Sequence, residues 1–153
     1  MALDKDQIGT IGKHLLITNL FAAGFEVAEP ILDRGIDLIA FHDGKSGERF
    51  DAWPIQVKSS SGKSFVLDKK YKKLPRLVIV YVWNATIPEK AEFFAVTYGE
   101  ALEVLKKRKH TKRSSWKEGG RWVATKVGTK LETLLEPYKV TAEGWKRKLL
   151  AVR

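Results

Sequence analysis

Residues 77–83 (LVIVYVW) form the most β-prone segment of the chain. Nearly every side chain in this run is β-branched or aromatic, which is typical of a strand in a packed sheet. Strand patterns also occur at residues 36–41 (IDLIAF), 49–59 (RFDAWPIQVKS) and 91–97 (AEFFAVT), and a short strand is expected at 25–28. The chain must therefore fold around a sheet of at least four strands.

Helical patterns alternate with these strands. Asp4 and Gln7 have the spacing of a capping box, and apolar residues follow at helical intervals until Gly24, which can end the helix. Further helices are expected at 98–109, at 129–136 from a second capping box (Thr129 and Glu132), and at 141–150. This order predicts an α/β protein with a mixed sheet flanked by helices. A length of 153 residues fits a single domain.

Several local signals refine this scheme. Pro54 inside the strand pattern suggests an edge, a bulge or a break. Asp43-Gly44 is typical of a tight turn. Residues 114–117 and 121–125 flank two glycines in the manner of a basic hairpin. Tryptophans interleaved with Lys and Arg fit either packing into a satellite core or contact with exposed bases; they are Trp116, Trp122 and Trp145.

The positive charge is concentrated at one end of the chain. The net charge is +10, yet residues 1–104 hold 13 basic and 14 acidic side chains, whereas residues 105–153 hold 15 and 4. The sequence therefore predicts a nearly neutral core (1–104) and a basic C-terminal extension (105–153) that contacts a polyanion, or alternatively a solvated basic surface. The residues expected to contact DNA there are Lys106, Lys107, Arg108, Lys109, Lys112 and Arg113.

Composition removes several other classes of function. The chain has no cysteine, which excludes disulfides, thiol nucleophiles and cysteine-based zinc sites. No apolar run is long enough for a membrane span, and the first residues lack the apolar region of a signal peptide. We therefore expect a cytoplasmic protein with no membrane partner, associated with the nucleoid if it is prokaryotic.

One group of polar residues stands out against the strand patterns. Asp37 interrupts an apolar strand, and Gln56 and Lys58 lie two residues apart on the next strand, so their side chains share one face. Carboxylate and amide oxygens are ligands suited to Mg²⁺, and a nearby lysine can orient a water or stabilise a phosphate. This set predicts metal-assisted hydrolysis of phosphodiesters; the alternative is a set of ordinary solvated residues at strand ends.

The segments 11–25 (IGKHLLITNLFAAGF), 34–41 (RGIDLIAF) and 54–60 (PIQVKSS) resemble the PD-(D/E)XK nuclease superfamily, in particular its restriction-endonuclease-like and Holliday-junction-resolvase-like members. The resemblance implies a restriction-endonuclease-like fold and a nuclease dependent on Mg²⁺ or Mn²⁺. It assigns Asp37 as the metal-binding aspartate, Gln56 as the (D/E) position and Lys58 as the lysine. The backbone carbonyl of Val57 is then a further metal ligand.

The motif departs from the superfamily pattern at two places. Gln56 is neutral, and Lys13 stands where many members carry a glutamate on the first helix. The metal affinity should therefore be low, unless another carboxylate contributes from among Glu26, Glu29, Asp33 and Asp51. A catalytically degenerate module that binds DNA or RNA on the same fold is the alternative function.

The residues after Lys58 add a possible phosphate contact. Ser59, Ser60 and Lys63 can hold a phosphate beside the metal, or they form a simple flexible loop. The sequence thus predicts a metal-dependent endonuclease that acts on double-stranded or branched DNA, for example in repair, recombination or restriction. A homodimer is plausible for an enzyme that cuts both strands.

Overall fold

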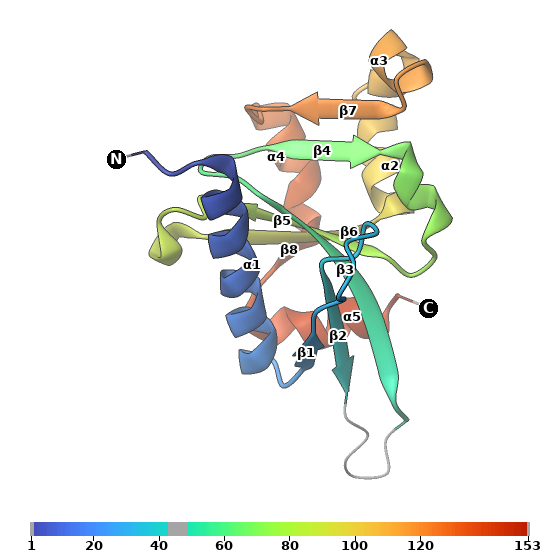
Figure 1. Ribbon diagram of the computed structural model, residues 1–153. Helices are drawn as coiled ribbons and strands as arrows, with labels where there is room; N and C mark the ends of the chain where they lie inside the picture. The colour runs from blue at the N-terminus through green and yellow to red at the C-terminus, as the bar shows by residue number, and fades with distance from the viewer. Residues whose placement is uncertain (1, 43–48, 153) are drawn as a thin grey trace.

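The computed structural model describes residues 2–42 and 49–152. The strand predicted at residues 77–83 lies in the middle of the molecule (Figure 1). Six strands form one mixed sheet in the order β1-β2-β3-β5-β6-β8, in which β3 and β5 are parallel and the other neighbours are antiparallel. This confirms the predicted mixed sheet flanked by helices. The strands are β1 (Glu26–Ala28), β2 (Leu38–His42), β3 (Asp51–Ser59), β5 (Val78–Trp83), β6 (Glu92–Thr97) and β8 (Lys139–Val140).

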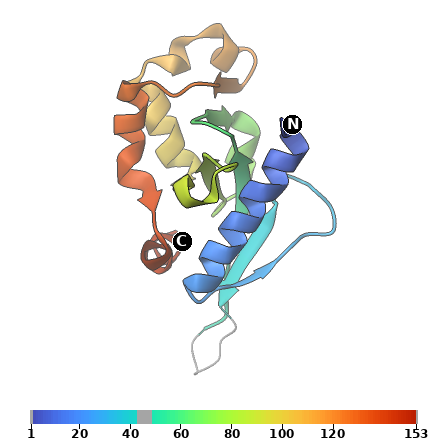
Figure 2. The ribbon, with the colours of Figure 1, turned by 90° about the vertical axis from the view of Figure 1, so that its left-hand side faces the viewer.

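Helices cover both faces of this sheet (Figure 2). The capping box of the first helix is confirmed: Asp4 and Gln7 exchange hydrogen bonds at its start. Gly24 follows its end with a φ of +86°, a conformation that glycine adopts without strain. The α-helices are α1 (Lys5–Ala22), α2 (Tyr98–Lys107), α3 (Ser114–Lys117), α4 (Thr129–Leu135) and α5 (Trp145–Leu150).

The alternation of side chains along β5 divides the interior into two cores. Val78, Val80 and Val82 pack towards α1 and α5, whereas Ile79 and Tyr81 pack towards α2 and α4. Every residue of β5 is buried. A strand that is apolar on both faces needs cover on both sides, which explains why 77–83 lacks the polar alternation of an exposed strand.

A second, two-stranded sheet crosses one end of the molecule. It pairs β4 (Phe65–Asp68) with β7 (Arg121–Ala124). The predicted basic hairpin is therefore wrong, because residues 114–117 form α3 and residues 121–124 pair with β4. The strand at 65–68 (FVLD) has only three apolar residues before an aspartate, which is too short a pattern to predict a strand.

Two other local predictions need correction. The capping box predicted from Thr129 and Glu132 is wrong: Thr129 is the first residue of α4, and the N-cap is Gly128, which has no side chain to accept a hydrogen bond. Glu132 binds Lys63 instead. Pro54 causes no break in β3. The Ile55 carbonyl points towards β2, where it accepts a hydrogen bond from the Asp37 N–H, so the nitrogen of the preceding Pro54 points towards β5. Pairing with β5 begins only at Ile55, so the missing N–H of Pro54 costs no hydrogen bond between these strands. The predicted turn at Asp43-Gly44 lies outside the described residues.

The basic segment 105–153 is built into both cores. Its strand β8 extends the main sheet and β7 completes the small sheet. Trp145 and Leu149 of α5 pack in the core beneath α1, whereas Leu131 and Leu135 of α4 pack on the opposite face. Residue 104 therefore marks a change in charge along the chain, while the packing continues across it.

Helix α1 contacts the main sheet closely at Gly12. A Cβ atom at this position would lie 1.9 Å from the Ser59 Oγ atom at the end of β3. Only a glycine allows the helix backbone to approach the strand so closely. The contact places the first half of α1 beside the end of β3, where the candidate site residues lie.

Candidate active site

Asp37 immediately precedes β2 and is hydrogen-bonded to β3. Its backbone N–H donates to the Ile55 carbonyl at 2.8 Å. Its Oδ2 atom accepts from the Gln56 Nε2 atom at 2.5 Å and from the Val57 N–H at 2.7 Å. Asp37, Gln56 and the Val57 backbone thus meet at one carboxylate oxygen.

The alternation of β3 directs the remaining side chains. Gln56 is buried and Lys58 is half-buried on one face, while Val57 packs against the core beneath α1. The Lys58 Nζ atom lies 5.6 Å from the centroid of the Tyr71 ring. This ring belongs to the 3₁₀ turn Lys69–Lys73, so the small sheet's flanking turn forms one wall of the site.

Asp37, Gln56 and Lys58 line a cavity of about 490 Å³ between α1 and the end of β3. A second cavity of about 480 Å³ lies on its other side and shares Asp33, Gln56 and Lys58 with it. The helix contributes Lys5, Asp6, Gly9, Thr10 and Lys13 to the first cavity, and the turn side contributes Arg34, Lys70, Tyr71 and Lys73 to the second.

Burial shifts the pKa values of the two central charged groups in opposite directions. Burial raises the pKa of Asp37, a shift that the nearby Asp33 charge increases and the Val57 N–H hydrogen bond opposes. Burial lowers the pKa of Lys58, and the Asp37 charge opposes this shift. Both charged forms are therefore less favourable here than in water, which is a common property of functional sites.

The raised pKa of Asp37 predicts the acid limb of any activity that needs its carboxylate. Cleavage should fall, on acidification, at a higher pH than an ordinary aspartate at about 3.9 would produce. Asp33→Asn removes a like charge, so it lowers the Asp37 pKa and moves this limb to lower pH. The measurement is the pH dependence of the cleavage rate. The control is Asp51→Asn: Asp51 binds Arg76 outside the two cavities, so its removal should leave the acid limb of the rate profile in place. An unmoved limb in Asp33→Asn would contradict this assignment.

Lys13 lines the cavity between α1 and the end of β3. Its Nζ atom binds Glu29 Oε1 at 2.6 Å, and its charge partly offsets the effect of burial, which raises the pKa of Asp37. Of the four carboxylates considered as additional ligands, Asp33 is the one that lines the cavity. Glu29 is held by Lys13, Asp51 is held by Arg76 at 2.7 Å, and Glu26 is exposed on β1.

The sequence patterns missed the acidic and hydroxyl groups of α1. Asp6, Gly9, Thr10 and Lys13 recur at intervals of three and four residues and line the cavity together. This spacing places them on one face of the helix, which is the signal that could have identified them. Tyr71 was also missed, because the residues around it are lysines and its contact with Lys58 is formed only in the fold.

The predicted phosphate-binding residues after Lys58 differ in their surroundings. Ser59 lines the cavity, and its hydroxyl is buried against Gly12 without a hydrogen-bond partner among the described residues. The Ser60 hydroxyl donates to the Gly62 carbonyl at 2.7 Å. Lys63 Nζ binds Glu132 Oε1 at 2.5 Å, so this lysine joins the loop to α4. Of the predicted tail residues, Lys106 binds Glu103 and Arg108 is half-buried, while the following are exposed: Lys107, Lys109, Lys112 and Arg113.

A carboxylate and neutral oxygens around Asp37 are donors of the type that a hard divalent cation accepts. No three His, Asp or Glu side chains among residues 2–42 and 49–152 are grouped to hold a metal, so a cation at Asp37 would need neutral oxygens such as those of Gln56 and Val57. In this structure the Gln56 amide nitrogen faces Asp37, so its N–H group occupies the place beside the carboxylate that a cation would take. With a cation in that place, a half-turn of the amide would bring the Gln56 Oε1 atom towards it.

Comparisons with known proteins give a match at the level of fold. No protein-family model matches the chain, and no curated protein matches it. A solved structure of a bacterial homing endonuclease, I-Ssp6803I, matches with a TM-score of 0.53 over 99% of this chain and 95% of the other, at 15% sequence identity. None of the helices in the described ranges has the length and apolar character of a membrane span. The chain thus has an endonuclease-like mixed α/β fold.

Proposed function

We propose that this chain is a divalent-metal-dependent endonuclease that hydrolyses DNA phosphodiester bonds, as a degenerate member of the PD-(D/E)XK superfamily. The observation that carries the proposal is the convergence of Asp37, Gln56 and Lys58 in one cavity at the end of β3. The fold shared with a homing endonuclease supports the same reaction class. The exposed basic residues after α2 (Lys107, Lys109, Lys112 and Arg113) supply positive charge that attracts DNA within this single domain.

Each residue has a distinct chemical role in this mechanism. Asp37, Gln56 and the Val57 carbonyl would hold Mg²⁺ or Mn²⁺, which would supply positive charge beside the phosphoryl oxygens. Lys58 reaches the same cavity from the next position on the same face of β3. In its charged form Lys58 donates hydrogen bonds to a phosphate oxygen. Its lowered pKa increases the fraction of neutral amine, and this neutral form can accept a proton from the attacking water.

The direct test is a cleavage assay with linear, supercoiled and branched DNA in the presence of Mg²⁺ or Mn²⁺. Cleavage that stops on addition of EDTA and falls about 10²–10⁴-fold in Lys58→Met supports the proposal. The matched control is Lys90→Met, an exposed lysine that lines neither cavity of the site. Intact DNA with both metals, at protein concentrations that saturate binding, would refute the nuclease assignment.

A non-catalytic DNA-binding module on this fold is the second candidate. The specific observation in its favour is that Lys13, a cation, lies in the cavity and lowers the pKa of Asp37 without a metal. This candidate predicts tight binding of DNA without cleavage and no stabilisation by Mn²⁺. Competition between duplex DNA and duplex RNA for binding identifies the nucleic acid in either case.

The neutral Gln56 sets the metal affinity. Gln56→Glu adds a second anionic ligand next to Asp37, so we expect Mn²⁺ to bind at least 10-fold more tightly and to raise Tm more than in the wild type. Without metal the two carboxylates repel, so the apo variant should have a lower Tm. Gln7→Glu makes the same chemical change in the capping box of α1 and should alter neither result. Equal Mn²⁺ affinity in Gln56→Glu and wild type would contradict the proposed ligand set.

A further inference from the structure

A second basic cavity lies apart from the candidate active site. Its volume is about 370 Å³, and it shares no lining residue with the catalytic cavity. Three parts of the basic segment form it: the end of α2, the strand β7 and the start of α4. The lining side chains that can bond or stack are Arg108, His110, Trp122, Lys126, Thr129 and Lys130.

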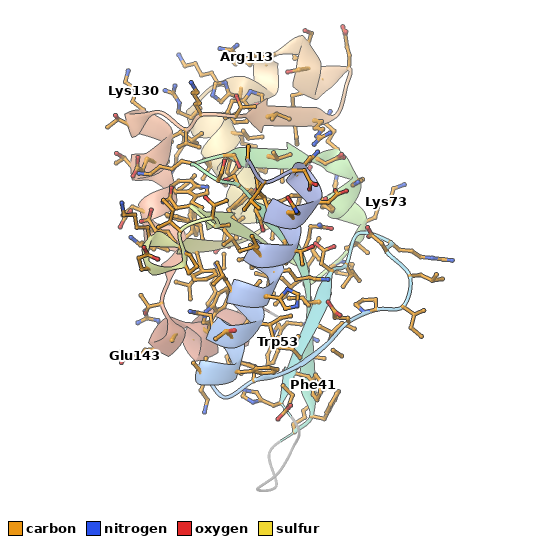
Figure 3. The ribbon with its side chains drawn as sticks, turned by 60° about the vertical axis from the view of Figure 1, so that its left-hand side comes forward. Phe41, Trp53, Lys73, Arg113, Lys130 and Glu143 are labelled. Atoms are coloured by element: carbon orange, nitrogen blue, oxygen red, sulfur yellow. The ribbon has the colours of Figure 1, made fainter. Side chains whose placement is uncertain are left out.

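The charge of this cavity has one sign. Arg108, Lys126 and Lys130 line it, and none of its lining residues in the described ranges is acidic. The nearest acidic side chain along α4, Glu132, is held by Lys63 at 2.5 Å. Lys130 and Arg113 lie at the same end of the molecule in Figure 3, so further positive charge surrounds the cavity. Such a site attracts an anion.

Two polar atoms in the cavity wall lack partners. Arg108 Nε and His110 Nδ1 are both buried without a hydrogen-bond partner among the described residues. His110 is only 8% exposed. A buried polar group left unpaired costs about 1–3 kcal/mol, and buried groups in native proteins are nearly always paired. Two such atoms in one cavity therefore indicate a ligand that accepts hydrogen bonds.

The fold holds these groups in place from separate elements. The His110 ring stacks on Trp122 with centroids 4.1 Å apart and planes inclined by 19°. Stacking covers a ring face and leaves the edge of the imidazole for hydrogen bonding. Trp122 is held in place by β7, where it pairs with Leu67 of β4. Lys109, with a φ of +58°, reverses the chain after α2 between Arg108 and His110.

We propose that this cavity binds a backbone phosphate of duplex DNA, at a contact separate from the cleaved bond. The guanidinium and the two ammonium groups neutralise the phosphate, and the Arg108 Nε–H and the imidazole N–H donate to its oxygens. Burial, followed by the charges of Arg113 and Arg108, lowers the pKa of His110. A neutral imidazole still donates from one ring nitrogen. The proposal does not depend on whether the chain cleaves DNA.

The first test measures binding of a 20-base-pair DNA duplex in EDTA, over a range of salt concentrations. Lys126→Glu/Lys130→Glu should weaken binding at least 10-fold and reduce the slope of log K against log salt by about 1, because the loss of one phosphate contact removes about 0.9. Lys146→Glu/Arg147→Glu makes the same charge change on α5, which begins two residues after Glu143, labelled in Figure 3. This control should leave the slope nearly unchanged. Equal slopes in the two double variants would overturn the proposal.

The second test observes the site itself by NMR of the histidine side chains. The imidazole ¹⁵N signals of His110 should shift on addition of the duplex, whereas those of His42, which packs between Phe25 and Trp53, should not. No shift of His110 would mean that water satisfies its buried nitrogen, and the proposal would fail. Saturation by inorganic phosphate without competition from the duplex, or stronger competition by duplex RNA, would also overturn it. Because metal is absent, failure of the nuclease proposal has no effect on either result.

Discussion

Asp37→Asn is expected to reduce DNA cleavage by at least about 10²–10³-fold while the protein remains folded. The carboxylate is the only anionic member of the proposed ligand set, and its Oδ2 atom also positions Gln56 and the Val57 N–H. Asparagine keeps the size of the side chain and one acceptor oxygen. It removes the negative charge that would balance a cation and the developing charge at the phosphate.

The stability of Asp37→Asn follows from the raised pKa of Asp37. Since burial disfavours the ionised carboxylate, its cost is present above the folded-state pKa and disappears as pH falls through that value. We therefore expect a Tm at pH 7 equal to or above that of wild type, with the difference shrinking on acidification. Asp4→Asn, which keeps its helix cap, is the control for both measurements. Full cleavage activity in Asp37→Asn would refute the catalytic assignment.

Trp145→Ala is expected to lower the free energy of unfolding by about 3–5 kcal/mol. Trp145 is fully buried in the core beneath α1, and its Nε1–H donates to Asn19 Oδ1 at 2.7 Å. The substitution removes an indole that joins α5 to α1 across residues far apart in sequence. Urea denaturation followed by circular dichroism measures the effect.

Trp145→Phe separates the two contributions of the indole. It keeps most of the apolar contact and loses the hydrogen bond to Asn19, so its stability should lie between those of wild type and Trp145→Ala. If residues 105–153 pack as part of one domain, Trp145→Ala still unfolds in a single transition. Two separate transitions would show that the basic segment unfolds independently and would contradict the single-domain proposal.

The elements that local sequence predicted are those with strong local causes. The capping box of Asp4 and Gln7 is formed by side chains three residues apart, so no tertiary contact is needed to define it. The run 77–83 is apolar on both faces and can only be a covered strand or a buried helix, and its β-branched residues favour the strand. These signals correctly placed α1, β3, β5 and β6 to within a few residues.

The elements that the sequence missed depend on distant partners. The strand β4 is only four residues long and exists because β7, more than fifty residues later, pairs with it. Glu132 matches a capping box by spacing, yet it binds Lys63 on another loop, which no local pattern reveals. The tryptophans interleaved with basic residues are explained likewise: Trp116 and Trp145 are buried in the cores.

The residues of the candidate site also fall into those that the sequence identified and those that only the fold brings together. The residues Asp37, Gln56 and Lys58 were identified because a polar group inside a strand pattern is conspicuous, and the structure brings them together within one cavity. Asp6 and Tyr71 were not selected, because they lie in the first turn of a helix and in a 3₁₀ turn, where polar and aromatic residues are common. Asp33 was one of four additional carboxylates considered, and the sequence alone did not distinguish it from the other three. The walls that these residues give to the two cavities form only when α1 and the 3₁₀ turn Lys69–Lys73 pack beside β3.

The sequence by itself determined a mixed α/β fold, a polar triad on neighbouring strands and a surplus of positive charge after residue 104. These follow from side-chain periodicity and composition, which act over a few residues. Only the tertiary structure decided where that charge lies in space. Residues 105–153 contribute to both cores, and the end of α2, the strand β7 and the start of α4 together form a basic cavity. The physical reason is that burial and electrostatic fields depend on distances in space, which the order of residues does not specify.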